Sequence, residues 1–388
     1  MGPSEYTLSK LERKLRQDGI KETVLSTTDL VVRKEFGRPL FEYLIKTGYI
    51  ENIPREQLKR VSNETLTLAE PSDNSDQPFV STLSSGYILS ETGLTLTNRW
   101  ELIEESAAVP DYARQAMMAM LSRELFFGHL PSSVVIKSTY NQDVAELNMT
   151  ASLIPRYANY YHWMIDTVPK IRYLQIFENE TDQNVTALIP SNAPPFVHQT
   201  LQLLGWPQSK NVVAEDKMYK VNNLIVPSFP ERRPTDLRWV RRNILSTFAD
   251  EKQKERSSKY IYVSRSHDIE RRVTNEDELI DMLTKYGFNK YNLEDRSVKE
   301  NAKLFRDADI VIGPHGAGLT DILFSDECVL VEFFGKKVKH HYKNMAEKLD
   351  HKYVPMHCES KGADIVVNVD EVERLISNQI NTKNAECT

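Results

Sequence analysis

Residues 310–324 read IVIGPHGAGLTDILF, and this stretch decides the fold. The β-branched run 310–312 predicts a buried parallel strand. Gly-Pro at 313–314 ends the strand, the glycine-rich segment 315–318 turns the chain, and 319–324 begins a helix. Such a turn brings backbone N–H groups to a ligand, and the helix N-terminus adds roughly half a positive charge. We therefore expect a phosphate or diphosphate to bind here.

Strands and helices alternate on both sides of this turn. Before it, we predict a hairpin at 86–97, strands at 134–137, 145–154, 187–189 and 223–226, and helices at 111–125, 160–177 and 196–204. Around and after it, we predict strands at 260–263, 310–312, 329–333 and 352–354, with helices at 274–287, from 297, from 319 and at 342–349. The S/T-x-x-D/E patterns at 274–277 and 297–300 predict side-chain caps at the start of two of these helices. Alternation of this kind is typical of parallel sheets, so the sequence predicts an α/β fold with two Rossmann-like halves.

The length of 388 residues favours more than one domain. Residues 1–80 read as a helical N-terminal extension, in which leucines three or four residues apart share a helix face. We interpret this extension as a packing segment or as the contact of a homo-oligomer, with a recognition role as the alternative. The segment 71–78, PSDNSDQP, reads as a linker or exposed loop. Residues 81–242 and 243–388 are then the two Rossmann-like domains.

Composition and charge argue against several classes of protein. The net charge is −6 and the pI about 5.9, whereas general nucleic-acid binding needs a basic surface. Three cysteines without C-x-x-C spacing indicate neither a disulfide framework nor a zinc site. The polar N-terminus matches neither a signal peptide nor an anchor, and no run reaches the ~18 apolar residues of a membrane-spanning helix. We therefore expect a cytoplasmic protein, soluble or peripheral on the cytoplasmic membrane face.

A second stretch that carries chemistry is 159–169, which reads NYYHWMIDTVP. His162 and Asp166 are four residues apart, so on a helix they share one face. Asn159 is placed to cap that helix. Trp163 points elsewhere on the helix and is predicted to pack in the core.

A third stretch is 260–278, which reads YIYVSRSHDIERRVTNEDE. Ligands of open parallel sheets bind beyond the carboxyl ends of the strands, and Arg265 and Arg272 follow the predicted strand at that end. The planar fork of arginine suits phosphate oxygens. We expect Arg271 to face solvent. We interpret the five arginines of 231–242 as a solvated face, with the alternative that part of this segment faces the cleft between the two halves.

At these spacings the three stretches together resemble family 61 of the glycosyltransferases, which includes plant xylosyltransferases and animal O-linked N-acetylglucosamine transferases. The resemblance runs from about residue 86 to 355 and rests on the H-G-A-G-L turn and the Y-H-W-x-x-D segment. It implies the GT-B architecture, in which two Rossmann-like domains with parallel sheets face a cleft. Residues 81–242 would bind the acceptor and 243–388 the nucleotide sugar.

The resemblance also implies an activity. We expect an inverting, metal-independent transfer of a hexose or pentose from a nucleotide sugar, with UDP as the nucleotide, to a hydroxyl of a glycan or lipid-linked saccharide. No cofactor and no metal are expected. The D-x-D at 307–309 lies before its strand, at the wrong edge of the sheet for a ligand, so we do not assign a metal to it.

The expected donor-binding residues follow the carboxyl ends of the C-terminal strands. In the family pattern, one arginine closely follows the strand at 260–263 and a second precedes the next helix, as two arginines do here. Glu332 is placed to bind ribose hydroxyls, with a helix cap or a buried paired carboxylate as the alternative. A backbone-bonded loop histidine is the alternative for the histidine of the turn. The full set is Arg265, Arg272, His315, Gly316, Ala317, Gly318 and Glu332.

The expected catalytic residues are His162 and Asp166. Inverting transfer needs a base beside the acceptor hydroxyl, and either side chain can supply it. A structural network at the helix start is the alternative. Two other functions remain open: a polysaccharide pyruvyl transferase, which would prefer phosphoenolpyruvate, and a non-catalytic nucleotide-sugar-binding subunit, which would bind nucleotide without transfer.

Overall fold

A computed structural model describes residues 42, 51–68, 77–108, 115–117, 144–215, 218–249, 259–265 and 271–386. The described residues up to Val240 form one compact unit, and those from Arg241 onward form another. We call these the N-terminal unit and the C-terminal unit. The helices predicted before residue 50, the segment 71–76, the strand at 134–137 and most of the helix at 111–125 lie outside the described residues.

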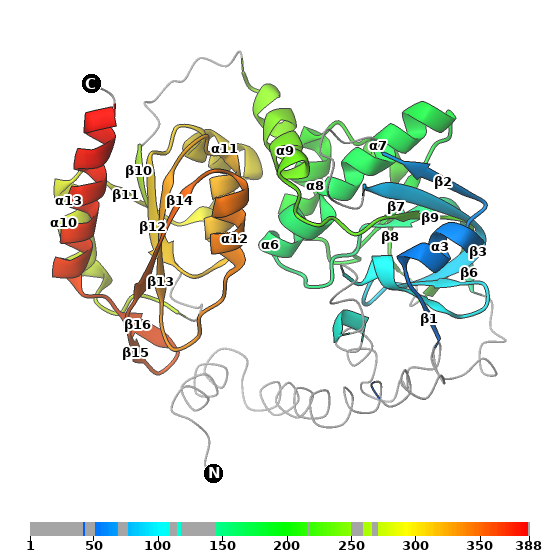
Figure 1. Cartoon of the computed structure of the whole chain (residues 1–388), viewed down its shortest axis with the longest axis horizontal. Coiled ribbons are helices and arrows are strands. Elements are labelled where there is room, and N and C mark those ends of the chain that lie inside the picture. Colours follow the sequence, from blue (N-terminus) through cyan, green and yellow to red (C-terminus); the bar gives the residue numbers. More distant parts are fainter. Residues whose placement is uncertain are drawn as a thin grey trace, which may run out of the picture. The chain divides into compact units, whose positions relative to one another are not determined.

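The N-terminal unit is built on a mixed sheet (Figure 1). Its elements are β1 (Asn52–Ile53), α3 (Arg55–Val61), β2 (Glu64–Thr67), β3 (Phe79–Leu89), β4 (Thr95–Thr97), β5 (Leu102–Ile103), η2 (Glu104–Ser106), β6 (Ala145–Ser152), α6 (Tyr160–His162), η3 (Trp163–Thr167), α7 (Pro169–Thr181), β7 (Thr186–Ile189), α8 (Pro195–Leu203), η4 (Gln208–Lys210), β8 (Asn211–Val213), β9 (Met218–Pro227) and α9 (Pro234–Ser246). Helix α9 leads from this unit into the next one.

Among the described residues, the strands of this sheet follow the order β1-β5-β4-β3-β9-β6-β7-β8, with β2 also paired to β3. Strands β6, β7, β8 and β9 are parallel and form the α/β part of this sheet. The β3–β4 hairpin, predicted from its alternating pattern, extends the sheet by antiparallel pairing with β9. Chain order reverses between β6 and β9, which makes their carboxyl ends a topological switch point, where α/β proteins bind ligands.

The C-terminal unit holds a parallel sheet between two layers of helices. Its elements are β10 (Tyr260–Val263), α10 (Glu276–Lys285), β11 (Asn289–Tyr291), η5 (Leu293–Asp295), α11 (Val298–Arg306), β12 (Ile310–Pro314), η6 (Ala317–Phe324), β13 (Val329–Phe334), α12 (His341–Lys348), β14 (Lys352–His357), β15 (Glu359–Lys361), β16 (Asp364–Val366) and α13 (Val369–Glu386). Helices α10 and α13 cover one face of the sheet, and α11 and α12 cover the other (Figure 1).

The strand order of this sheet is β11-β10-β12-β13-β14, with all described pairs parallel. Its core on the α10 side includes Tyr262, Ile312 and Val331 of the strands and Leu279 and Ile376 of the helices. Chain order reverses between β10 and β12, so a second switch point lies at their carboxyl ends. The predicted α/β class is thus confirmed in both units.

Local predictions in the C-terminal unit were confirmed in part. Ser297 and Glu300 form the predicted capping box at the start of α11, since each side chain accepts a hydrogen bond from the backbone N–H of the other. At the start of α10 the predicted cap is not used: Asn275 instead bonds both backbone groups of Val367, which follows β16. The helix predicted from 319 is a tighter 3-10 helix that begins at Ala317.

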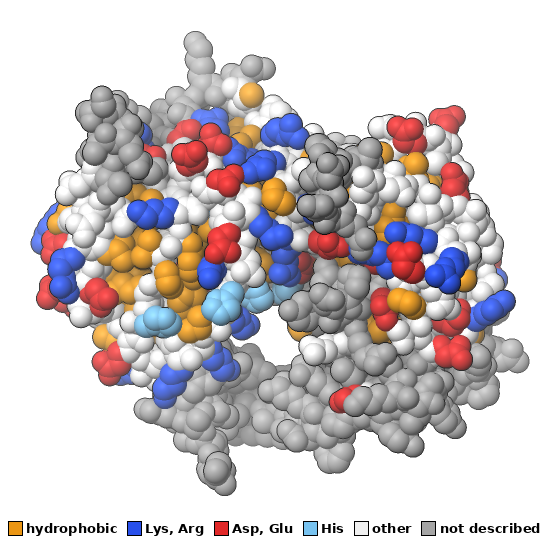
Figure 2. All heavy atoms as spheres, in the orientation of Figure 1, with side chains coloured by type: hydrophobic (Ala, Val, Ile, Leu, Met, Phe, Trp, Pro, Cys, Tyr) orange, Lys and Arg blue, Asp and Glu red, His pale blue; other side chains and the backbone are white. Residues whose placement is uncertain are grey.

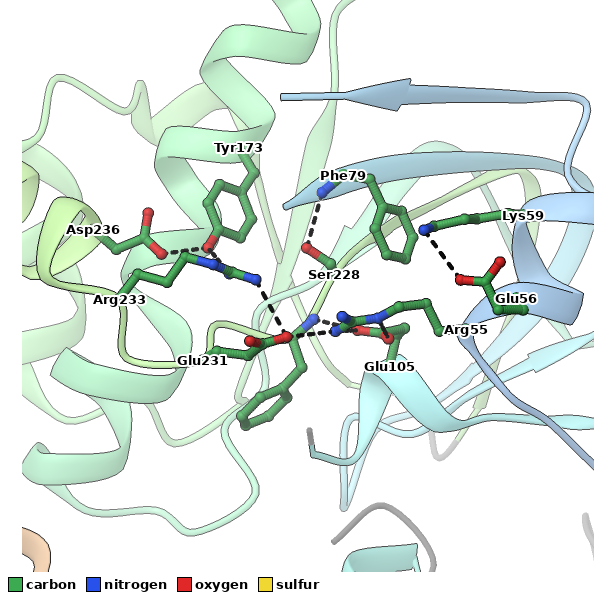
Figure 3. A network of polar contacts seen from close by, with 11 residues as sticks. Arg55, Glu56, Lys59, Phe79, Glu105, Tyr173, Ser228, Glu231, Arg233 and Asp236 are labelled. Carbon is green, nitrogen blue, oxygen red and sulfur yellow. Dashed lines mark hydrogen bonds and ion pairs between the residues drawn. The ribbon is translucent and has the colours of Figure 1, made fainter. Parts of the chain in front are cut away.

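A buried ionic network ties helix α3 of the N-terminal unit to the end of its sheet (Figure 3). Arg55 of α3 bonds Glu105 at 2.5 Å and Glu231 at 2.9 Å, and Arg233 bonds Glu231 at 3.2 Å. The Arg55 and Glu105 side chains are only 5% and 2% exposed. A charge in such a place is stable only while its partner remains.

We expect Arg55→Ala to lower the free energy of unfolding by roughly 3–5 kcal/mol, because it leaves Glu105 buried and unpaired. The matched control is Lys59→Ala. Lys59 also lies on α3 over the Phe79 ring, but it pairs with Glu56 near the surface. The control should change stability by less than about 1 kcal/mol. Urea unfolding followed by circular dichroism measures both, and similar losses in the two variants would contradict the assignment.

Candidate functional site

The first candidate site lies in the N-terminal unit, where the chain leaves β6. Asn159 caps the next helix as predicted, because its Oδ1 accepts a hydrogen bond from the backbone N–H of His162 at 3.0 Å. The helix then passes through one π-helical stretch, Trp163–Thr167, a feature frequent at functional sites. Trp163 is 1% exposed, which confirms the predicted core packing. His162 and Asp166 are thereby held at the β6–β9 switch point.

Three side chains meet at this point. His162 Nδ1 and Asp166 Oδ2 are 2.6 Å apart. Arg232, on the segment that follows β9, donates Nε–H to Asp166 Oδ1 at 3.0 Å and Nη2–H to Oδ2 at 3.4 Å. The backbone φ of Arg232 is 55°, a left-handed value that costs an arginine free energy. The two strand ends of the switch point therefore each supply a part of the site.

The arginine-rich segment is thus only partly a solvated face. That prediction is wrong for Arg232 and for Arg233, which is 7% exposed, whereas Arg238 and Arg242 are exposed as expected. The physical reason is that Arg232 bonds Asp166, which is distant from it in the sequence. Only the pairing of strands in the sheet brings the two residues together.

The protonation state of Asp166 follows from its surroundings. Burial alone would raise its pKa, but the hydrogen bond from His162 and the charge of Arg232 hold that pKa below its ordinary value. Asp166 is therefore ionised at neutral pH, and His162 donates its Nδ1–H to the carboxylate. This contact selects the tautomer with a lone pair on Nε2. In this arrangement Nε2 of His162 is able to accept a proton, and Asp166 orients the imidazole ring.

Lys170 is a member of this site that the sequence analysis missed. It follows Asp166 by four residues, as Asp166 follows His162, and that repeated spacing was the available signal. Lys170 is 7% exposed, and its Nζ lies 5.6 Å from the centre of the Phe229 ring. Burial lowers its pKa to about 8, against the attraction of Asp166 and Glu105. Within the described part of the chain it forms no hydrogen bond or ion pair.

The second candidate site lies in the C-terminal unit, at the turn after β12. Arg265 follows β10, and its Nη1–H donates to the backbone oxygen of His315 at 3.2 Å. A Cβ on Gly316 would lie 1.6 Å from that Nη1, so the glycine allows the arginine to lie against the turn. Ala317 begins the 3-10 helix, and Gly318 packs against the end of β10. The structure thus brings the predicted turn and Arg265 together.

His315 forms the centre of a buried relay. Its Nδ1 is hydrogen-bonded to Oε1 of Glu332 on β13, and Tyr353 of β14 donates its O–H to Glu332 Oε2 at 2.7 Å. Glu332 is 0% exposed and both its oxygens are engaged. A direct hydrogen bond between Glu332 and a ribose would therefore compete with these contacts. Glu332 instead affects a ligand indirectly, through its hydrogen bond to His315.

The charge state of this pair is opposite to that of the first site. Burial raises the pKa of Glu332 to about 8, although Tyr353 and Arg271 act in the other direction. Burial, and after it the charges of Arg271 and Lys339, lower the pKa of His315 to about 3. At neutral pH, Glu332 therefore keeps its proton and donates it to Nδ1. The ring proton of His315 is then on Nε2, where it is available as a donor.

Basic side chains gather around the same turn. Lys339 belongs to the segment 336–341, KKVKHH, which follows β13 and is exposed over residues 336–340. Figure 2 shows histidine and basic side chains side by side on this unit. Arg271 is half-buried and lies close enough to act on His315, rather than facing solvent as expected. A basic run at the carboxyl end of a predicted strand was the signal that the sequence analysis left unused.

The remaining predicted residues have other surroundings. Arg272 donates Nη2–H to Asp364 Oδ2 at 3.0 Å, and its backbone N–H donates to Oδ1 at 3.1 Å, which fixes the segment beside β16. Asp307 ends α11, and Asp309 precedes β12 and pairs with Lys259 at 3.4 Å. Both aspartates lie at the amino edge of the sheet, as expected for a helix-to-strand turn.

None of the helices among the described residues is both long and apolar enough to cross a bilayer. In the same part of the chain, no group of three or more His, Cys, Asp or Glu side chains is arranged to hold a metal ion.

The family model Glycosyltransferase 61 matches residues 160–332. This match supports membership of the chain in glycosyltransferase family 61. The matched segment begins at the helix that carries His162 and Asp166 and ends at Glu332, so it spans both histidine–carboxyl pairs. No curated protein matches the chain. The family makes the protein a glycosyltransferase, and the donor, the acceptor and the stereochemistry are left to the site.

We expect Lys170→Met to raise the free energy of unfolding at pH 7, because it removes a buried ammonium that has no bonded partner. The depression of the pKa from 10.5 to about 8 corresponds to at most roughly 3 kcal/mol. Wild-type stability should rise as the pH increases from 8 to 10.5, since only the unfolded state then keeps the proton. The gain of the variant should shrink over this range. Chemical unfolding at pH 7 and pH 10 tests this, and a destabilised variant at pH 7 would contradict it.

Proposed function

We propose that the protein is an inverting, metal-independent glycosyltransferase that moves a sugar from a nucleotide sugar, UDP-linked, to a hydroxyl of a glycan or lipid-linked acceptor. The observation that carries the proposal is the contact of Asp166 with His162 and Arg232 at the β6–β9 switch point. We further propose a GT-B arrangement, in which the C-terminal unit binds the donor and the N-terminal unit binds the acceptor.

The donor diphosphate is proposed to bind at the turn 315–318. Backbone N–H groups, Arg265, Arg271 and Lys339 offer the positive charge that a leaving diphosphate needs, which supports transfer without a metal. His315 donates Nε2–H to a phosphate or sugar oxygen. We assign the second arginine contact to Arg271, because the guanidinium of Arg272 already bonds Asp364.

The acceptor hydroxyl is proposed to bind at Nε2 of His162. As the hydroxyl oxygen attacks the anomeric carbon, its proton passes to Nε2, and the bond to the diphosphate breaks on the opposite face of the sugar. The imidazolium that forms is stabilised by the carboxylate of Asp166, so the charge of Asp166 matters most in the transition state. One displacement of this kind inverts the anomeric configuration.

We expect UDP to stabilise the wild-type protein against heat with EDTA present, and Arg265→Ala and Arg271→Ala each to lose most of the shift. A ligand at a hundred times its dissociation constant adds roughly 2.7 kcal/mol, which a thermal-shift assay resolves readily. The matched control is Arg272→Ala, which removes the Asp364 pair and should keep the UDP shift. A panel of nucleoside diphosphates and phosphoenolpyruvate is run alongside.

Loss of the UDP shift in Arg272→Ala, with retention in Arg271→Ala, would contradict the arginine assignment. Stabilisation by phosphoenolpyruvate and by no nucleotide would overturn the donor class and favour pyruvyl transfer. Dependence of the UDP shift on a divalent cation would overturn metal independence.

We expect His162→Ala and Asp166→Asn to slow sugar transfer at least about a hundredfold while UDP binding is unchanged, because both residues act on the acceptor side. The assay measures release of UDP from the nucleotide sugar that gives the largest thermal shift. The control is Asp182→Asn, an exposed aspartate of the same unit. Full activity in Asp166→Asn would contradict the proposed mechanism and favour a binding role for the protein.

A further inference from the structure

Lys170 is a buried cation of the N-terminal unit that has no hydrogen-bonded partner within the described part of the chain. Four arginines of the same unit do have a carboxylate in hydrogen-bond range: Arg55 bonds Glu105 and Glu231, Arg172 bonds Asp236, Arg232 bonds Asp166, and Arg233 bonds Glu231. The ammonium of Lys170 has only the face of the Phe229 ring. The region therefore has positive charge in excess at Lys170.

The two carboxylates nearest in effect to Lys170 do not satisfy it. Asp166 already accepts from His162 and Arg232, and Glu105 accepts from Arg55 and from the backbone N–H of Phe229 at 2.6 Å. Both attract Lys170 at longer range only. An ammonium has three N–H donors, and burying them unbonded costs free energy. A residue that only filled space here would be more stable as methionine, which indicates a role outside folding.

We propose that Lys170 binds an anionic group of the acceptor, a carboxylate or a phosphate, beside the hydroxyl that His162 deprotonates. This inference rests on the proposed function and narrows its acceptor to a charged saccharide. Lys170 and His162 are 7% and 8% exposed, so each side chain still reaches the surface, and both flank Asp166 on the same helix.

The chemistry favours an anion over a neutral hydroxyl. Arg232 balances Asp166 and Arg55 balances Glu105, so an anion at Lys170 meets one unbalanced positive charge. Charge-assisted hydrogen bonds are roughly twice as strong as neutral ones, and they strengthen when water is excluded. The ring of Phe229 beneath the ammonium holds the charge without offering a competing oxygen.

The test compares matched saccharides on the full chain with UDP present, so that the donor site is occupied. The pairs are methyl β-glucuronide with methyl β-glucoside, and mannose 6-phosphate with mannose. Saturation-transfer NMR titrations give the affinity of each. We expect one anionic member to bind at least about tenfold more tightly than its neutral partner. The pair that shows the preference tells carboxylate from phosphate.

Lys170→Gln should remove the preference and leave the affinity of the neutral member and of UDP unchanged, whereas Lys170→Arg should keep it. The preference should also fade between pH 7 and pH 10, as Lys170 loses its proton. Equal binding of both members, binding of neither anion, or a preference that survives in Lys170→Gln would overturn the proposal. Failure of the glycosyltransferase proposal would appear separately, as absent UDP binding and transfer, because neither depends on the saccharide comparison.

Discussion

The ion pair between Arg232 and Asp166 is the contact on which the chemistry of the N-terminal unit depends. Without the guanidinium, burial would push the carboxylate toward its neutral form, and His162 would lose the acceptor that orients its ring. The pair forms because β6 and β9 end side by side: one strand leads to the helix with Asp166, and the other leads to Arg232. The switch point of the sheet therefore determines the charge of the site.

The C-terminal unit uses the same two residue types with the opposite result. Glu332 is as buried as Asp166, but its hydrogen-bond partners are Tyr353 and His315, and no guanidinium bonds it. Burial then prevails and the carboxyl keeps its proton. The contact with Asp166 leaves Nε2 of His162 able to accept a proton, whereas His315 presents Nε2–H as a hydrogen-bond donor.

Many of the strands, helices and helix caps could be predicted from the sequence, because hydrophobic periodicity and the residues that end or cap an element are local features. Strands β10, β12 and β13, the Ser297 capping box and the i, i+4 spacing of His162 and Asp166 were all readable. What could not be read depends on contacts between distant segments. Arg232 looked like part of a solvated run until the sheet brought it to Asp166, and the roles of two adjacent arginines, Arg271 and Arg272, were decided by the position of Asp364.

The most direct test is to determine the tautomers of His162 and His315 in the wild-type chain. Long-range 1H–15N spectra of the protein with labelled histidine report which ring nitrogen carries the proton. The variants His162→Gln and His315→Gln assign the signals. At neutral pH we predict that the ring of His162 carries its proton on Nδ1 and none on Nε2. We predict that the ring of His315 carries its proton on Nε2 and none on Nδ1. Asp166→Asn should alter the signals of His162 alone. A His162 ring protonated at Nε2, or the same tautomer in both rings, would contradict this prediction.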